Sequence, residues 1–203
     1  MTDKIIPIGC TCNVSLALSR LGLRGPSSVF EWAVSNKLSE ITSLVKNQFK
    51  DISAETHNGH QVRIKTTGIF TGHYDLNTYD GLLKRRASRF IDDIKNTSGT
   101  IVFLRRDSTE SPSTYKEIDD FIKAVLEINP NCKCKMLLIG ISKPEQFVPI
   151  NHELLIHTFI DPQDVPYGEY WDEAGDISIW DKIIKNLRLD FPRYETRYRE
   201  DKN

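Results

Sequence analysis

Short apolar runs alternate with amphipathic segments along this chain, and this alternation constrains its fold more than any other feature. The runs TIVFLRRD, KMLLIGI and ELLIHTFI are typical of strands, and QVRIKTTGIFTGHYDL is typical of a strand or hairpin. Apolar residues recur at helical spacing in five segments, which are 14–21, 38–49, 79–95, 118–126 and 176–189. The pattern predicts an α+β chain whose helices and strands are interleaved.

The length of 203 residues suits a single domain over 1–203, with a polar tail that is expected to fray from about residue 193. Lys and Arg number 27 and Asp and Glu number 28, so the net charge is -1 and nothing favours nucleic acid as a partner. No apolar stretch is long enough to span a bilayer, and the N-terminus lacks a signal-peptide pattern. We therefore expect a cytoplasmic protein, and its oligomeric state stays open.

The four cysteines form two close pairs, Cys10 with Cys12 and Cys132 with Cys134. Both pairs have the spacing C-x-C, whereas structural zinc sites use longer spacings and further ligands. We therefore expect no metal site and no cofactor. Three of the four cysteines fit the ordinary role of a free cysteine, which is that of a small buried apolar residue.

Cys12 is the exception, because it lies in a polar turn between two predicted elements. In IIPIGCTCNVSLALSRLGLR, a strand over 5–8 precedes the turn, and a helix begins at Cys12 or Asn13. Free backbone N–H groups and the helix dipole favour an anion at a helix N-terminus. A thiolate is such an anion, so Cys12 is the candidate nucleophile.

A cysteine hydrolase also needs an imidazole that transfers the proton and a polar group that orients the imidazole. His73 follows a predicted strand and Asp107 ends the run TIVFLRRD, so we expect Cys12, His73 and Asp107 to form a triad. Asp75 is the alternative orienting acid, although a residue only two positions away rarely aligns with the far ring nitrogen. The ordinary interpretations are a surface histidine and a capping or turn aspartate.

Several motifs, taken in order, resemble a family of papain-like cysteine peptidases of unknown function. They are IGCTC at the cysteine turn, LGLR at the end of its helix, VFEW, GHYDL, LLKRRASRF and IVFLRRD, and they span about residues 5–110. The family's cysteine falls on Cys12 and its histidine on His73. Glu31 stands where the family has aspartate, and Val29 stands where it has proline. A structural, a substrate-binding and an oxyanion-supporting role therefore stay open for Glu31.

The resemblance implies a papain-like domain in which the helix carrying the cysteine packs on a small central sheet. It implies a peptidase or protein deamidase that forms a thioester acyl-enzyme with a protein or peptide substrate. The order of the residues is similar to that in papain-like effectors that deamidate Rho-family GTPases. A non-catalytic binding or effector module is the alternative. A carbohydrate-related enzyme is less favoured, because the chain lacks a Gly-rich phosphate loop.

The oxyanion of such a reaction would be held by the backbone N–H of Cys12 and by a nearby side chain. Candidates for this contact or for contact with substrate lie in the cysteine turn and in VFEW, and they are Thr11, Asn13, Glu31 and Trp32. The run KRRASRF carries three basic side chains, Arg85, Arg86 and Arg89. These could bind an acidic partner, but solvated helix arginines in ion pairs are the commoner explanation, and they stay outside the catalytic set.

Overall fold

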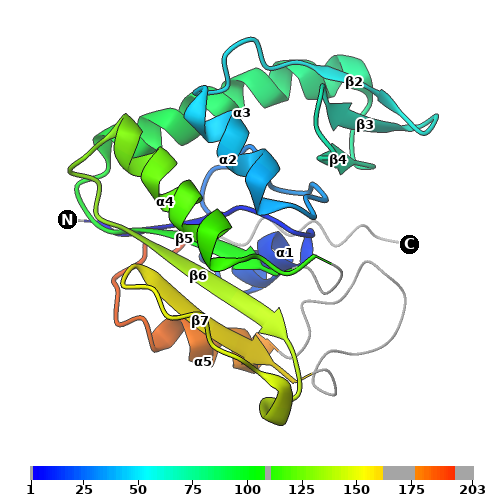
Figure 1. The fold of residues 1–203 in the computed structure, drawn as a ribbon. Helices are drawn as coiled ribbons and strands as arrows, with labels where there is room; N and C mark the ends of the chain where they lie inside the picture. The colour runs from blue at the N-terminus through cyan, green and yellow to red at the C-terminus, as the bar shows by residue number, and fades with distance from the viewer. Residues whose placement is uncertain (1, 108–110, 162–176, 195–203) are drawn as a thin grey trace.

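The structure, a computed structural model, describes residues 2–107, 111–161 and 177–194. Its centre is a parallel sheet of four strands in the order β1-β5-β6-β7 (Figure 1). The strands are β1 (Lys4–Pro7), β5 (Ile101–Arg106), β6 (Cys134–Ile141) and β7 (Leu155–Ile160). Three of them come from the runs that the sequence marks most clearly, and parallel strands that are covered on both faces read as continuous apolar runs.

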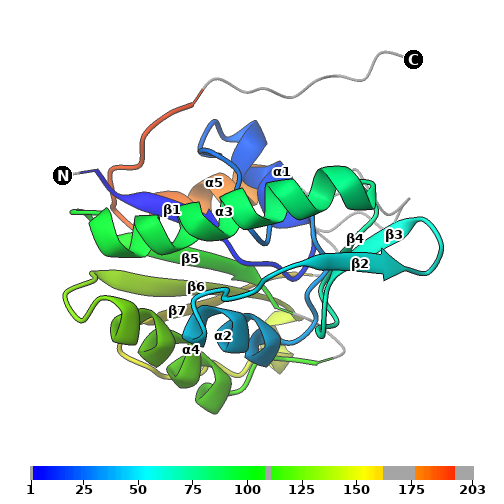
Figure 2. The ribbon, with the colours of Figure 1, turned by 90° about the horizontal axis from the view of Figure 1, so that it is seen from above.

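Helices cover both faces of this sheet. One face is covered by α2 (Leu38–Lys46), α3 (Leu76–Asn96) and α4 (Tyr115–Ile128), and the other by α1 (Asn13–Arg20) and α5 (Ile177–Lys185). Figures 1 and 2 show α3 and α5 on opposite sides of the strands. Successive residues of β5 pack on opposite faces, since Phe103 belongs to the core under α3 and α4, and Val102 and Leu104 belong to the core under α1 and α5.

A second, antiparallel sheet lies at the N-terminal end of α3 and outside the central sheet (Figure 1). Its strands are β2 (Ala54–His57), β3 (Gln61–Ile64) and β4 (Phe70–Thr71), in the order β2-β3-β4. β2 lies in the polar stretch KDISAETHNGH, where the sequence pattern predicts no strand. The side chains of β2 are half-buried or exposed, so the strand has no apolar alternation, and its pairing with β3 defines it.

The fold class is confirmed as mixed α and β, with the helix that follows the cysteine packed on the central sheet. Cys12 is the N-cap of α1, as expected from the sequence. Thr114 and Glu117 form a reciprocal capping box at the start of α4, and β6 leads to the short 3-10 helix η1 (Pro144–Gln146). α3 begins three residues earlier than its apolar pattern indicates, because Asp75 caps it.

The expected fraying of the tail falls mainly on residues after 194, which lie outside the described residues. The last described residues are tied to the end of α1: Arg193 donates to the Leu21 carbonyl at 2.6 Å, and the Tyr194 N–H donates to the Gly22 carbonyl at 2.8 Å. Within the described ranges, no helix has both the length and the apolar character that crossing a membrane requires.

Candidate active site

The carboxyl ends of β1 and β5 create a natural site in this fold. The two strands are neighbours, but the chain leaves β1 for α1 on one face and leaves β5 for α4 on the other face. Ligands of open parallel sheets bind where adjacent connections diverge in this way. Cys12 follows β1 at this point, and Asp107 follows β5, so the topology brings two of the three expected triad residues to one edge of the sheet.

Cys12 is half-buried, and it is the cysteine with the greatest solvent access, since Cys10, Cys132 and Cys134 are buried. Its carbonyl accepts the first intrahelical bond of α1 from Leu16 N–H at 3.0 Å. Its thiol donates a long hydrogen bond, 3.9 Å, to the amide oxygen of the Asn13 side chain. The thiol therefore sits at the helix start with polar neighbours, as a nucleophile would.

The electrostatics of Cys12 differ from the expectation of a ready-made thiolate. Burial raises the pKa of the thiol above its ordinary value, and this effect outweighs the backbone N–H of Cys12 and the positive charge of Arg106, which both lower the pKa. At neutral pH the resting form is therefore the thiol. A base must remove the proton as the sulfur attacks.

His73 follows β4, and its backbone N–H donates to Thr71 Oγ1 at 3.2 Å. His73 is an exposed residue, and the Trp32 ring packs edge-on against its imidazole, with ring centroids 5.4 Å apart. Partial burial lowers the pKa of His73 below the ordinary value for histidine, because the charged ring loses hydration. The imidazole is therefore neutral at neutral pH, which is the form that can accept a proton.

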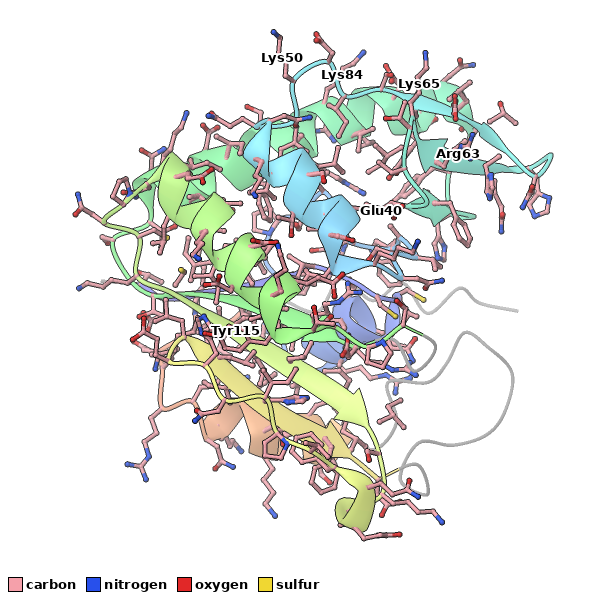
Figure 3. The ribbon with its side chains drawn as sticks, viewed as in Figure 1. Glu40, Lys50, Arg63, Lys65, Lys84 and Tyr115 are labelled. Atoms are coloured by element: carbon pink, nitrogen blue, oxygen red, sulfur yellow. The ribbon has the colours of Figure 1, made fainter. Side chains whose placement is uncertain are left out.

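The hairpin that leads to His73 is held to the body of the protein by Glu40 of α2. Glu40 Oε1 accepts a hydrogen bond of 3.0 Å from the backbone N–H of Gly68, in the turn between β3 and β4. Figure 3 shows Glu40 on the side of α2 that faces the small sheet. The next residue after His73 is Tyr74, whose OH accepts a hydrogen bond of 2.9 Å from Arg86. The segment around His73 is thus fixed by contacts at both ends.

Trp32 is held in an unusual backbone conformation, with φ at +61°. A non-glycine residue in this region stores strain that its surroundings must offset. The guanidinium of Arg24 lies 5.3 Å from the centre of the Trp32 ring, on which it exerts a cation–π attraction. Trp32 therefore contacts Arg24 as well as His73, and forms one wall beside the imidazole.

Glu31 is 2% exposed, and its carboxylate is occupied by groups of its own loop. Glu31 Oε2 accepts from Arg24 Nε at 2.9 Å, and Oε1 accepts from Ser28 N–H at 3.0 Å. The same arginine reaches Trp32, so Glu31 fixes Arg24 and thereby the Trp32 wall. Of the roles left open by the sequence, these contacts support the structural one.

The two candidate orienting acids have clear partners in the structure. The Asp107 carboxylate is buried and accepts from Ser113 twice, from Oγ at 2.7 Å and from N–H at 2.8 Å. The charge of Asp107 also opposes the lowering of the pKa of His157 that burial causes. Asp75 accepts from Thr78 N–H at 2.9 Å and from Thr78 Oγ1 at 2.7 Å. A hydrogen bond from the His73 ring to either acid stays a prediction.

The remaining candidates divide into turn residues and helix arginines. Thr11 Oγ1 is buried and has no hydrogen-bond partner among the described residues, so it has an unused donor next to the nucleophile. On α3, Arg85 is exposed, whereas Arg89 donates to the Ser27 carbonyl at 2.9 Å. Arg86 is buried and bound to Tyr74, as noted above. Two of the three arginines thus brace the protein internally.

Sequence reasoning overlooked Arg106, whose charge acts on Cys12. The signal was present in the alternation of β5: Arg105 points to the face of α2 and α3, so Arg106 leaves the strand on the face of α1. The sequence presents Trp32 only as a candidate for contact with the oxyanion or the substrate, because its left-handed backbone and its place beside His73 are set by residues distant in sequence. Among the described residues, no group of three His, Cys, Asp or Glu side chains gathers where it could hold a metal ion.

One of three comparisons with known proteins gave a match. Comparisons with curated proteins and with solved structures gave no match. A family model described as "Putative papain-like cysteine peptidase (DUF1796)" matches residues 3–143. This range contains the cysteine turn, the small sheet with His73, and β5 with the acid that follows it. The chain belongs to this family of papain-like cysteine peptidases.

Proposed function

We propose that the protein is a cysteine-dependent amide hydrolase that acts on a protein or peptide, with Cys12 as nucleophile and His73 as general base and acid. The observation that carries the proposal is the position of Cys12, the most accessible of the four cysteines, at the start of α1 where the connections of β1 and β5 diverge. Family membership supports a cysteine hydrolase in general terms.

The protonation states support general-base catalysis rather than a stored ion pair. Burial favours the neutral thiol of Cys12, and it favours the neutral ring of His73. In the first step, the thiol proton passes to His73 as the sulfur bonds to the amide carbon. The imidazolium then gives this proton to the leaving amine as the C–N bond breaks. Water, deprotonated by His73, attacks the thioester and releases the acid and the Cys12 thiol.

The groups that hold the tetrahedral oxyanion and the imidazole complete the proposal. The backbone N–H of Cys12 is the first oxyanion donor, and Thr11 Oγ1 is the second, since it is buried beside the nucleophile with no other partner among the described residues. Asp107 is the proposed orienting acid, and Asp75 is the alternative. If the leaving amine is ammonia from a glutamine or asparagine side chain, the same steps make a deamidase, and if it is a peptide amine they make a peptidase.

The test is the rate at which iodoacetamide alkylates each cysteine, followed by mass spectrometry of peptides. We expect Cys12 to react first, and His73→Ala to slow its alkylation at least tenfold at pH 7. His60→Ala is the matched control, because His60 is an exposed histidine of the β2–β3 hairpin, and it should leave the rate unchanged. If the alkylation rate of Cys12 is the same in His73→Ala as in the wild type, the proposed hydrolase is rejected and the non-catalytic binding module is favoured.

A further inference from the structure

Arg106 is a cation placed next to the proposed nucleophile by the backbone itself. Its N–H donates to the Gly9 carbonyl at 3.1 Å, and its carbonyl accepts from Cys10 N–H at 3.0 Å. These two bonds join the last residue of β5 to the turn that leads into Cys12. The position of the Arg106 backbone relative to the turn is therefore fixed from both sides.

The direction of the Arg106 side chain follows from the pleat of β5. Val102 and Leu104 pack under α1 and α5, and Arg106 is the next residue of this alternating series. Arg105 leaves the strand on the opposite face, where it binds the carbonyls of Ser35 and Asn36. The side chain of Arg106 thus lies on the α1 face, and its buried Nε has no hydrogen-bond partner among the described residues.

Among the described residues, Arg106 is the cation whose charge acts on Cys12 at the N-terminus of α1. The first turn of α1 has no acidic residue, and the single charged side chain of this helix is Arg20 in its last turn. α5 packs against α1, and its Asp181 is paired with Lys185. Both printed hydrogen bonds of the Asp107 carboxylate come from Ser113, just before α4. The positive charge of Arg106 lowers the pKa of the Cys12 thiol. The His73 ring is neutral at neutral pH and adds no positive charge there.

We propose that Arg106 is the fixed positive charge that stabilises the Cys12 sulfur as His73 removes its proton. This inference rests on the proposed function. In an ion-pair enzyme the imidazolium itself stabilises the thiolate, but here the ring must be neutral before the reaction and is protonated only during it. A guanidinium stays charged throughout and does not compete for the proton. Arg106 lowers the free energy of the charged sulfur without taking part in proton transfer.

The experiment measures the charge at Cys12 directly. Alkylation rates are determined from pH 6 to 10 with neutral iodoacetamide and with anionic iodoacetate for the wild type, Arg106→Gln, Arg106→Lys and Arg85→Gln. Arg85→Gln is the matched control, because it removes the same charge from an exposed position on α3. A positive charge near the sulfur accelerates iodoacetate relative to iodoacetamide, and the ratio of the two rates reports that charge.

For Arg106→Gln, we expect the pH midpoint of iodoacetamide alkylation to rise by about one unit, which is a roughly tenfold slower reaction near neutrality. The ratio of the iodoacetate rate to the iodoacetamide rate should fall several-fold. Arg106→Lys should restore most of both effects, and Arg85→Gln should match the wild type. A packing role for Arg106 would leave the ratio unchanged.

Unchanged midpoint and ratio in Arg106→Gln would overturn the inference. If this variant does not fold, the test is made on the wild type alone. The ratio of the iodoacetate rate to the iodoacetamide rate at Cys12 must then be higher in the folded protein than in the same protein unfolded in urea. Equal ratios in the two states overturn the inference. The outcome for the proposed function is separate, because it depends on the His73→Ala rate. A charge effect without a His73 effect would retain Arg106 as a neighbour of Cys12 and reject the hydrolase.

Discussion

Replacement of Arg105 by methionine should destabilise the protein strongly, because this arginine joins three parts of the site from inside the core. Arg105 is fully buried, and its guanidinium donates to the carbonyls of Ile8 at 3.2 Å, Ser35 at 2.9 Å and Asn36 at 3.0 Å. Its Nε lies 3.8 Å from the carboxylate of Asp107. Arg105→Met keeps much of the side-chain volume and removes all of these donors.

The magnitude follows from the groups that lose a partner. Three carbonyl oxygens lose a charged donor, and each buried loss costs about 1 to 2 kcal/mol. Asp107 also keeps its charge while its cation is removed, and breaking a buried ion pair on one side costs about 3 to 5 kcal/mol in total where it has been measured. The three lost hydrogen bonds amount to about 3 to 6 kcal/mol, and the broken ion pair to about 3 to 5 kcal/mol. Both figures describe the loss of the same guanidinium and are not added, so we expect the free energy of unfolding to fall by about 4 kcal/mol. For a chain of this size, that is a fall in Tm of roughly 8 to 16 °C.

Urea unfolding followed by circular dichroism measures this change, with Tm from thermal scans as a second measurement. Arg85→Met is the control: Arg85 is exposed on α3, and a substitution there should stay within about 0.5 kcal/mol of the wild type. Arg105→Lys should lose a large part of the stability too, since an ammonium cannot reproduce the planar set of donors. A loss below about 1 kcal/mol in Arg105→Met would show that the carbonyls find other partners, and would refute the reasoning.

Three further predictions concern the site. Because partial burial lowers the pKa of His73, the acid limb of hydrolysis should lie below about pH 6.5, and His73 should oppose folding increasingly as pH falls below that unfolded-state value; an NMR titration of the ring checks its pKa, and a midpoint above 6.5 contradicts both expectations. Glu31→Gln should lower the free energy of unfolding by about 2 kcal/mol in urea, whereas a loss of activity at full stability would indicate a catalytic carboxylate. Asp107→Asn should reduce hydrolysis by orders of magnitude, whereas Asp75→Ala should only weaken the cap of α3; if Asp75→Ala alone abolishes hydrolysis, Asp75 is the orienting acid.

The strands of the central sheet and most of the helices could be predicted because local signals and tertiary packing agree. TIVFLRRD became β5, and the spacing of Val14, Ala17, Leu18 and Leu21 marked α1. β2 could not be predicted, because its pairing with β3 needs no apolar side chains. α3 starts before the first residue of its apolar pattern, because Asp75 caps it, so its first turn could not be predicted from that pattern.

For the site, sequence could propose residue types and their order, whereas their surroundings depend on long-range packing. The helix dipole favours a thiolate at Cys12, but the burial that opposes it comes from the packed fold. Likewise, no local pattern of Glu31 and Trp32 shows that Arg24 contacts both. The position of Arg106 near Cys12 could have been predicted from the alternation of β5, but only with the knowledge that β5 pairs with β1.

The pairing of β1 with β5 also has a consequence for synthesis of the chain. The arginine that contacts Ile8 follows it by 97 residues, and in the described part of the chain β5 is the one strand that pairs with β1. Until β5 has been made, the nascent chain carries Cys12 as an ordinary thiol on an unanchored segment, without Arg106 beside it. Closing so long a loop is slow compared with local helix formation. Thiol reactivity of the mature kind should therefore appear late, once β5 has left the ribosome, and in a fragment ending before β5 Cys12 should show only the reactivity of an ordinary thiol.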